Sequence, residues 1–262
     1  MRLGWKESRF VPVMTALIGA AWLTLWLWEY SPYGRYLDHG RWTEIGLAAS
    51  VCRVLPAGDV LLPALLYVGG WVLMSAAMML PTTLPLLDRF KRMIARREDQ
   101  RTLVALLVAG YLLAWLCFGV AAHILDAVLR GVAPFFGLLL FNGWVVGAGV
   151  LAVAGAFQFS RLKYHCLDKC RTPLSFLSQH WNGQAPRRNA FLLGLHHGMF
   201  CVGCCWAIML LMFVVGTGNV GWMLVLGALM ALEKNASWGR RLSRPLGFGL
   251  LTWAGAIIVA NA

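Results

Sequence analysis

Most cysteines and histidines of this chain lie in one short stretch of the sequence. Between residues 165 and 205 there are five of the seven cysteines, Cys166, Cys170, Cys201, Cys204 and Cys205, and four of the six histidines, His165, His180, His196 and His197. Thiolates and imidazoles are ligands of soft transition metals, and paired thiols are also redox groups. The stretch therefore predicts a metal site or a redox centre.

A helix over residues 190–215 would gather most of these groups on one face. With about 100° per residue, a face about 100° wide holds an imidazole, three thiols and a thioether. They come from His197, Cys201, Cys204, Cys205 and Met212. His196 points about 100° away from His197 and would serve a neighbouring helix or support the ligands. Because His197 and Cys205 are about 12 Å apart along the axis, this face predicts a ladder of metal sites.

A second helix, predicted over residues 61–87, offers thioether ligands. Met74 and Met78 are four residues apart and therefore share one helix face, which Pro81 joins a turn later. This helix and the helix over 190–215 cross the membrane in opposite directions, so the two methionines reach the depth of the cysteines. We predict that they face the thiols across the protein interior and complete a sulfur-lined path.

The segment that precedes the helix over residues 190–215 carries another thiol pair. Cys166 and Cys170 are also four residues apart, a spacing that suits a two-coordinate soft metal. Pro173 predicts that their helix ends near Arg171. We expect both thiols to lie near His196 or His197, because the following loop is rich in residues that form turns.

The donor set favours Cu(I) over other metals. Thiolate, thioether and imidazole ligands at low coordination number select Cu(I), whereas zinc prefers a closed tetrahedral set and is the second choice. We expect the carboxylates Glu233 and Asp168 to lie at or outside the inner membrane interface. A chain of this kind would receive or hold Cu(I), move it across the bilayer, or deliver it, with a metallochaperone or a cuproenzyme as partner.

Two other functions remain open. A thiol-disulfide oxidoreductase in the membrane would use Cys201, Cys204 and Cys205, because Cys-x-x-Cys is a redox spacing. A subunit that assists assembly without transport would need no chemistry of its own. No phosphate-binding loop is visible, and the pattern favours a binding protein over an enzyme.

The elements that position these residues are membrane helices. Of 262 residues, 60% are apolar and only 13% are charged, which excludes an ordinary soluble domain. We predict an all-α bundle in one integral membrane domain over residues 1–262, in contact with the lipid bilayer. Segments long enough to cross about 30 Å of hydrocarbon lie at residues 11–30, 61–87, 103–122, 134–159, 190–215, 220–232 and 245–260.

Basic residues give these seven segments an orientation. Nineteen of the 23 Lys and Arg fall between segments on the side that holds the N-terminus, and the other side keeps Arg35, Arg41, Arg53 and Arg130. Positive residues collect on the cytoplasmic side, so the N-terminus is predicted inside and the C-terminus outside. The net charge of +12 therefore reflects topology and does not indicate binding to nucleic acid.

Four short motifs resemble a bacterial family of uncharacterised, predicted metal-binding integral membrane proteins. They are W-x2-M-x3-M-M-x-P-x3-P from Trp71, K-x2-C-x3-C-R-x-P from Lys163, H-G-x2-C-x-G-C-C-W from His197, and Trp222-Met223 followed by Glu233-Lys234. The resemblance covers residues 60–260. It implies a metal-binding protein of the bacterial inner membrane.

Overall fold

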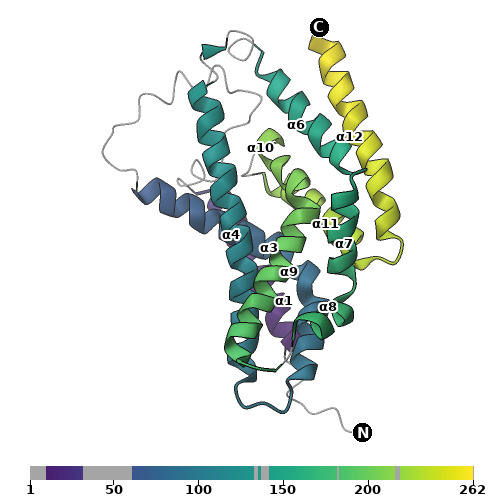
Figure 1. The fold of residues 1–262 in the computed structure, drawn as a ribbon. Helices are drawn as coiled ribbons and strands as arrows, with labels where there is room; N and C mark the ends of the chain where they lie inside the picture. Colours follow the sequence, from purple (N-terminus) through teal and green to yellow (C-terminus); the bar gives the residue numbers. More distant parts are fainter. Residues whose placement is uncertain are drawn as a thin grey trace.

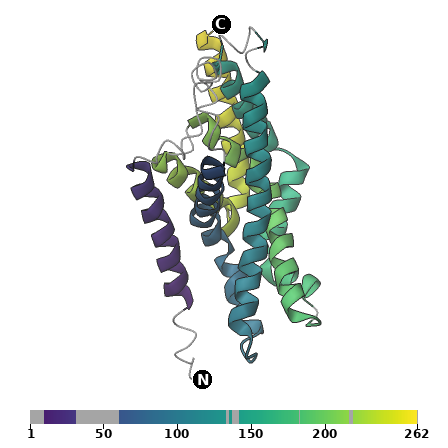
Figure 2. The ribbon, with the colours of Figure 1, turned by 90° about the vertical axis from the view of Figure 1, so that its left-hand side faces the viewer.

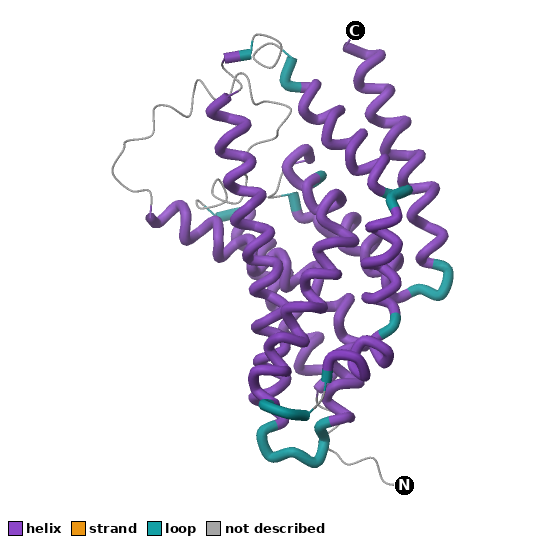
Figure 3. The backbone as a smooth tube through the Cα atoms, viewed as in Figure 1, coloured by secondary structure: helices purple, strands orange, loops and turns teal. Residues whose placement is uncertain are grey.

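The fold was analysed in a computed structural model of the chain. The structure describes residues 10–31, 61–132, 135–136, 142–181, 183–215 and 219–261. The predicted outer loop between residues 31 and 60 lies almost wholly outside this part. Its three basic residues, Arg35, Arg41 and Arg53, lie there too. Within the described residues all regular secondary structure is helical, as the composition predicts, and Figure 3 shows helices joined by short connections.

The helices follow one another with short breaks (Figure 1). Their bounds are α1 Phe10–Glu29, α3 Leu61–Met93, α4 Gln100–Val132, α6 Trp144–Phe157, α7 Arg161–Arg171, α8 Pro173–His180, α9 Pro186–Leu210, α10 Met212–Val215, α11 Val220–Asn235 and α12 Gly239–Asn261. A helix satisfies its own backbone hydrogen bonds, which is why apolar segments without water adopt it.

Among the described residues, fewer helices qualify as membrane spans by length and hydropathy than the seven that the sequence predicts. In the described part, four helices are long and apolar enough to cross a membrane, within residues 68–93, 100–129, 186–215 and 239–261. A fifth is counted if α6 and α7 form one bent span. The predicted segment 220–232 forms α11, which has only 16 residues, about 24 Å of helix.

The segment predicted at 134–159 differs most from expectation. Its helix, α6, begins only at Trp144, and α7 follows at an angle of 64°. The bend falls at residues 158–160, where the Ser160 side chain accepts a hydrogen bond from the backbone of Lys163 and caps α7. As predicted, α7 ends at Arg171 and Pro173 opens the next helix, because proline is well tolerated in the first turn.

Helix α9 lies at the centre of the bundle, against α4 on one side and α7 on the other (Figure 1). Its close approach to α4 depends on Gly194. A Cβ atom at that position would lie 1.9 Å from the backbone oxygen of Leu107, which no side chain could tolerate. The backbones of α4 and α9 are thus in direct contact, and this fixes Tyr111 on α4 beside the cysteines of α9.

The remaining helices surround this centre. Helix α3 packs against α1, α4 and α11, and α6 packs along α12. Figure 2 shows α1 on the side of the bundle away from α6 and α12. Helices α7 and α11 meet below the bend, and this junction carries the buried polar side chains of Gln158, Lys163, Glu233 and Ser243.

Candidate metal centre

The three thiols of α9 lie in the protein interior. Cys201, Cys204 and Cys205 are each 1% exposed and belong to one buried core with residues of α3, α4, α7 and α11. In a membrane helix, polar and ionisable groups face the bundle because lipid offers them no partner. The orientation agrees with a functional role for the face that the sequence predicts.

Cys201 has two polar neighbours from other helices. Its Sγ lies 2.8 Å from Nζ of Lys234 on α11 and 3.0 Å from the hydroxyl of Tyr111 on α4. The same hydroxyl donates to the backbone oxygen of Met79, at 3.2 Å. Three helices thus converge on a single sulfur atom.

Lys234 is buried, with 5% of its surface exposed. In the described part of the chain its Nζ contacts Cys201, the Sδ of Met79 at 3.8 Å and the Oγ1 of Thr82 at 3.5 Å. None of these partners is a carboxylate. A buried ammonium group needs a negative partner, and a thiolate at Cys201 is the one group in this shell that supplies a full charge.

The other thiols form a continuous group around Cys201. Cys204 donates to the backbone oxygen of Cys201, at 3.1 Å, and its sulfur lies 3.3 Å from that of Cys205. From α7, the thiol of Cys170 lies near those of Cys201 and Cys204. The thiols of α9 thus lie close together, with a further thiol from α7 beside them.

This thiol group is not arranged around a preformed cage. Among the described residues, no three or more His, Cys, Asp or Glu side chains have an arrangement that would hold a metal ion. Two thiolates on opposite sides of one ion stand about 4.6 Å apart if each bond is about 2.3 Å. The sulfur atoms of Cys204 and Cys205 are closer than this, so thiol side chains must turn apart to admit an ion. A two-coordinate ion demands the smallest such change.

Cys166 has a different environment from Cys170. It is 6% exposed, and its Sγ would lie 2.7 Å from a Cβ atom placed on Gly203 of α9. The thiol therefore packs against the backbone of α9. Of the predicted pair in α7, Cys170 lies near Cys201 and Cys204, and the proximity of the pair to His196 or His197 stays a prediction.

The two adjacent histidines of α9 have different environments. His197 is 2% exposed, and its Nδ1 has no hydrogen-bond partner among the described residues. Its ring centroid lies 5.9 Å from that of Tyr111 and 5.3 Å from that of Phe176. His196 is exposed and faces His180 of α8. The separation of the two histidines follows from the 100° helical step between them.

The predicted thioether ligands are buried in the same core as the thiols. This core holds Met74, Met78 and Met212 together with the cysteines. Met78 packs against Gly227 of α11, where a Cβ atom would lie 3.6 Å from its Cγ. Met79, which the sequence does not single out, contacts Lys234 through its Sδ. The role of Met74, Met78 and Met212 as ligands stays a prediction.

A second buried polar group lies beside the thiols. Nζ of Lys163 is 2.8 and 2.9 Å from the two carboxylate oxygens of Glu233, and it also donates to Gln158. The hydroxyl of Ser243 donates to the same carboxylate, at 2.8 Å. Glu233 is 2% exposed and therefore lies inside the bundle, while its depth at or outside the inner membrane interface stays a prediction. Its charge is neutralised by a lysine that the sequence assigns to an inner loop.

Arg171 completes the junction of α7 and α11. Its guanidinium group donates to the backbone oxygens of Glu233, Lys234, Ala236 and Ser237. These carbonyl groups lie at the C-terminal end of α11, where helices leave acceptors unpaired and favour a positive charge. In the K-x2-C-x3-C-R motif, the basic residues therefore hold α11, and the cysteines between them face α9.

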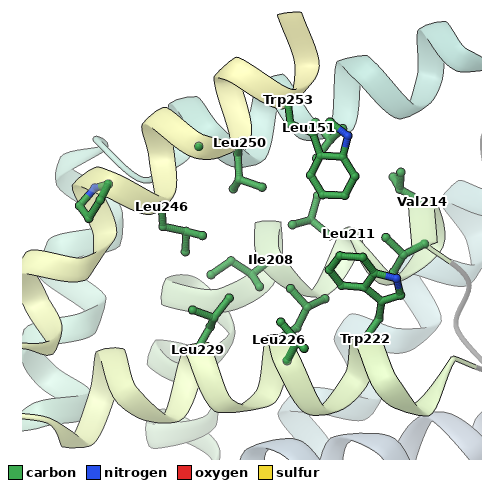
Figure 4. A pocket seen from close by; sticks show the side chains of 14 residues that line it. Leu151, Ile208, Leu211, Val214, Trp222, Leu226, Leu229, Leu246, Leu250 and Trp253 are labelled. Carbon is green, nitrogen blue, oxygen red and sulfur yellow. The ribbon is translucent and has the colours of Figure 1, made fainter. Parts of the chain in front are cut away.

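An apolar cavity in the bundle offers no groups that bind metal. It has a volume of about 280 Å³ and lies between α9, α11 and α12. Figure 4 shows that its walls are leucine and isoleucine side chains and the two indole rings of Trp222 and Trp253. None of the lining residues offers a thiol, imidazole or carboxylate, so the cavity cannot replace the thiol site.

Comparison with known proteins finds a family that matches most of the chain. The model of a family described as PpoB2, copper chaperone, matches residues 68–257. No curated protein and no solved structure matches the chain significantly. The match spans every helix that contributes a side chain to the thiol site, and it agrees with the metal-related family that the sequence motifs indicate.

Proposed function

The chain belongs to the PpoB2 copper chaperone family, and from this premise we propose that it binds Cu(I) at Cys201 and delivers it to a cuproenzyme. The ion is the cargo of the protein. Its other ligands come from the thiol group around Cys201, namely Cys170, Cys204 and Cys205. Exchange between neighbouring thiols gives the ion a short route out of the site without leaving it uncoordinated.

The contact between Lys234 and Cys201 is the observation that carries this proposal. Cu(I) with two thiolates has a single negative charge, and the buried ammonium group 2.8 Å from Cys201 neutralises it. Zn(II) with the same two thiolates is already neutral, so the lysine would leave an uncompensated positive charge in hydrocarbon. The charge balance thus favours a monovalent ion over zinc.

The membrane placement supports delivery at the bilayer. We propose a single integral membrane domain in the bacterial inner membrane, with seven spans, the N-terminus inside and the C-terminus outside. The 20-residue α1 and the apolar α11 would add to the four or five spans described above. Helix α1 begins at the lower end of the bundle and α12 ends at the upper end (Figures 1 and 2), in agreement with termini on opposite sides. A metallochaperone would supply copper from the inside.

The other functions that the sequence leaves open have less support. A thiol-disulfide oxidoreductase must bring a substrate thiol to its reactive sulfur, and all three thiols of α9 are 1% exposed. An assembly subunit without copper chemistry would have no use for a buried lysine beside a thiol. Movement of copper across the bilayer requires a continuous row of ligands, and the described thiols form a compact group.

The test is copper binding by the purified full-length protein under anaerobic, reducing conditions. We expect one or more Cu(I) ions per chain, held with sulfur ligands in X-ray absorption spectra. Cys201→Ser should lower the Cu(I) affinity by at least tenfold. Cys117→Ser is the matched control, because this thiol is exposed on α4. Sulfur-bound copper that is unaffected by Cys201→Ser would refute the assignment.

A further inference from the structure

A pair of imidazoles lies outside the thiol site, where α8 meets α9. The ring centroids of His180 and His196 are 5.5 Å apart, with an angle of 67° between the rings. His196 is exposed and His180 is partly exposed. Neither side chain belongs to the thiol group, and both are accessible from the surface.

The backbone of α8 fixes the state of one of these rings. Nδ1 of His180 lies 2.9 Å from the backbone oxygen of Phe176. A carbonyl oxygen only accepts hydrogen bonds, so Nδ1 carries the proton and Nε2 keeps a free lone pair. Proteins orient metal-binding imidazoles in this way, with the second nitrogen donating to a carbonyl group. The ring separation leaves room for an ion at about 2.0–2.1 Å from one nitrogen of each ring.

A single aromatic ring separates this pair from the buried site. Phe176 is 1% exposed; it stacks on His180 at 4.3 Å between centroids and meets His197 edge to face at 5.3 Å. Nδ1 of His197 is buried without a hydrogen-bond partner in the described part of the chain. His197 precedes Cys201 by one turn of α9. Imidazoles thus stand on both sides of Phe176, with the thiols directly behind them.

We propose that His180 and His196 form a receiving site that binds Cu(I) before it reaches the thiols. This inference rests on the proposed function. Two neutral imidazoles leave the ion with its positive charge, so they hold it less strongly than thiolates do. The ion moves on by ligand exchange: bonds from copper to nitrogen break as bonds to sulfur form, copper stays Cu(I), and the second thiol to bind releases its proton to water.

The first experiment isolates the receiving site. The full-length protein with Cys170→Ser, Cys201→Ser, Cys204→Ser and Cys205→Ser is offered Cu(I) as its bicinchoninate complex without oxygen. It should bind one ion with nitrogen ligands and no sulfur in X-ray absorption spectra. Adding His180→Phe and His196→Gln should remove this ion, and phenylalanine preserves the stacking on Phe176. Adding His165→Gln, an exposed histidine of α7, should not.

The second experiment keeps all thiols and measures the rate of loading. His180→Phe with His196→Gln should slow copper uptake at least tenfold and leave the final copper content unchanged. Uptake at the normal rate, or no histidine-bound ion in the variant that lacks these four thiols, would refute the receiving site. Neither result would contradict copper binding at the thiols. If the proposed thiol site is wrong instead, the wild-type protein will hold copper with nitrogen ligands only.

Discussion

Lys234 is the residue whose role differs most from its expected one. In the sequence it is one of nineteen basic residues that orient the chain. In the structure its ammonium group is buried and lies 2.8 Å from Cys201. The aliphatic part of Lys234 thus lies in the core, and its ammonium group lies at the proposed copper site. Charges near a metal ligand govern affinity as strongly as many ligands do.

Replacement of Lys234 by methionine should therefore weaken copper binding and keep the fold. Methionine fills a similar volume without a charge, so the complex of Cu(I) with two thiolates would remain uncompensated. We expect a loss of about 10–100-fold in Cu(I) affinity, the range for groups behind the ligands. The measurement is competition with a Cu(I) chelator, and Lys169→Met on α7 is the control. Equal affinity in both variants would mean that Lys234 does not balance the charge.

The burial of the thiol face could be predicted from the sequence, but its neighbours could not. His197, Cys201, Cys204 and Cys205 share a helix face by arithmetic alone, and all four are buried. Tyr111 and Met79 were missed because nothing local marks them. Each reaches the thiols only through the packing of α4 and α3 around α9 and α11. The pairing of Glu233 was missed for the same reason, since its partner Lys163 is 70 positions away in the chain.

At the level of elements, the buried ion pair of Lys163 and Glu233 joins α7 to α11. Removing one partner leaves the other charge buried and unpaired, so Glu233→Gln should lower the free energy of unfolding by roughly 3–5 kcal/mol. Replacing both residues, with Lys163→Met and Glu233→Leu, should recover most of that loss. Thermal unfolding in detergent measures both. If the double variant is no more stable than the single one, the pair does more than neutralise charge.

The contact of α4 with α9 gives a second prediction for the elements. Gly194→Ala adds one carbon where the backbone oxygen of Leu107 would lie 1.9 Å away, so the helices must separate. We expect a lower melting temperature and, because Tyr111 moves with α4, weaker copper binding. Gly249→Ala on α12 meets nothing within 4 Å and serves as the control. Equal stability of the two variants would show that the bundle adjusts without cost.

On the scale of the whole molecule, the topology remains to be tested. The charge distribution, the start of α1 at the lower end and the end of α12 at the upper end of the bundle lead us to expect the N-terminus inside and the C-terminus outside. Reporter fusions at both ends should report opposite sides of the inner membrane. Two ends on the same side would require an even number of spans and exclude seven.

The helical class was predictable because hydrophobic length alone determines it. The bend between α6 and α7 was not, because it depends on local capping.

Glu233 and Lys234 are consecutive residues of α11, yet they serve different partners. One holds α7 through Lys163, and the other contacts Cys201 on α9. If α11 turned about its axis to withdraw the lysine, it would also pull the carboxylate from Lys163 and strand two charges in hydrocarbon. We therefore expect α11 to stay in place when the site is loaded or emptied. In the proposed function, copper therefore enters and leaves by rotation of the thiol side chains, and ligand exchange sets the rate of its transfer.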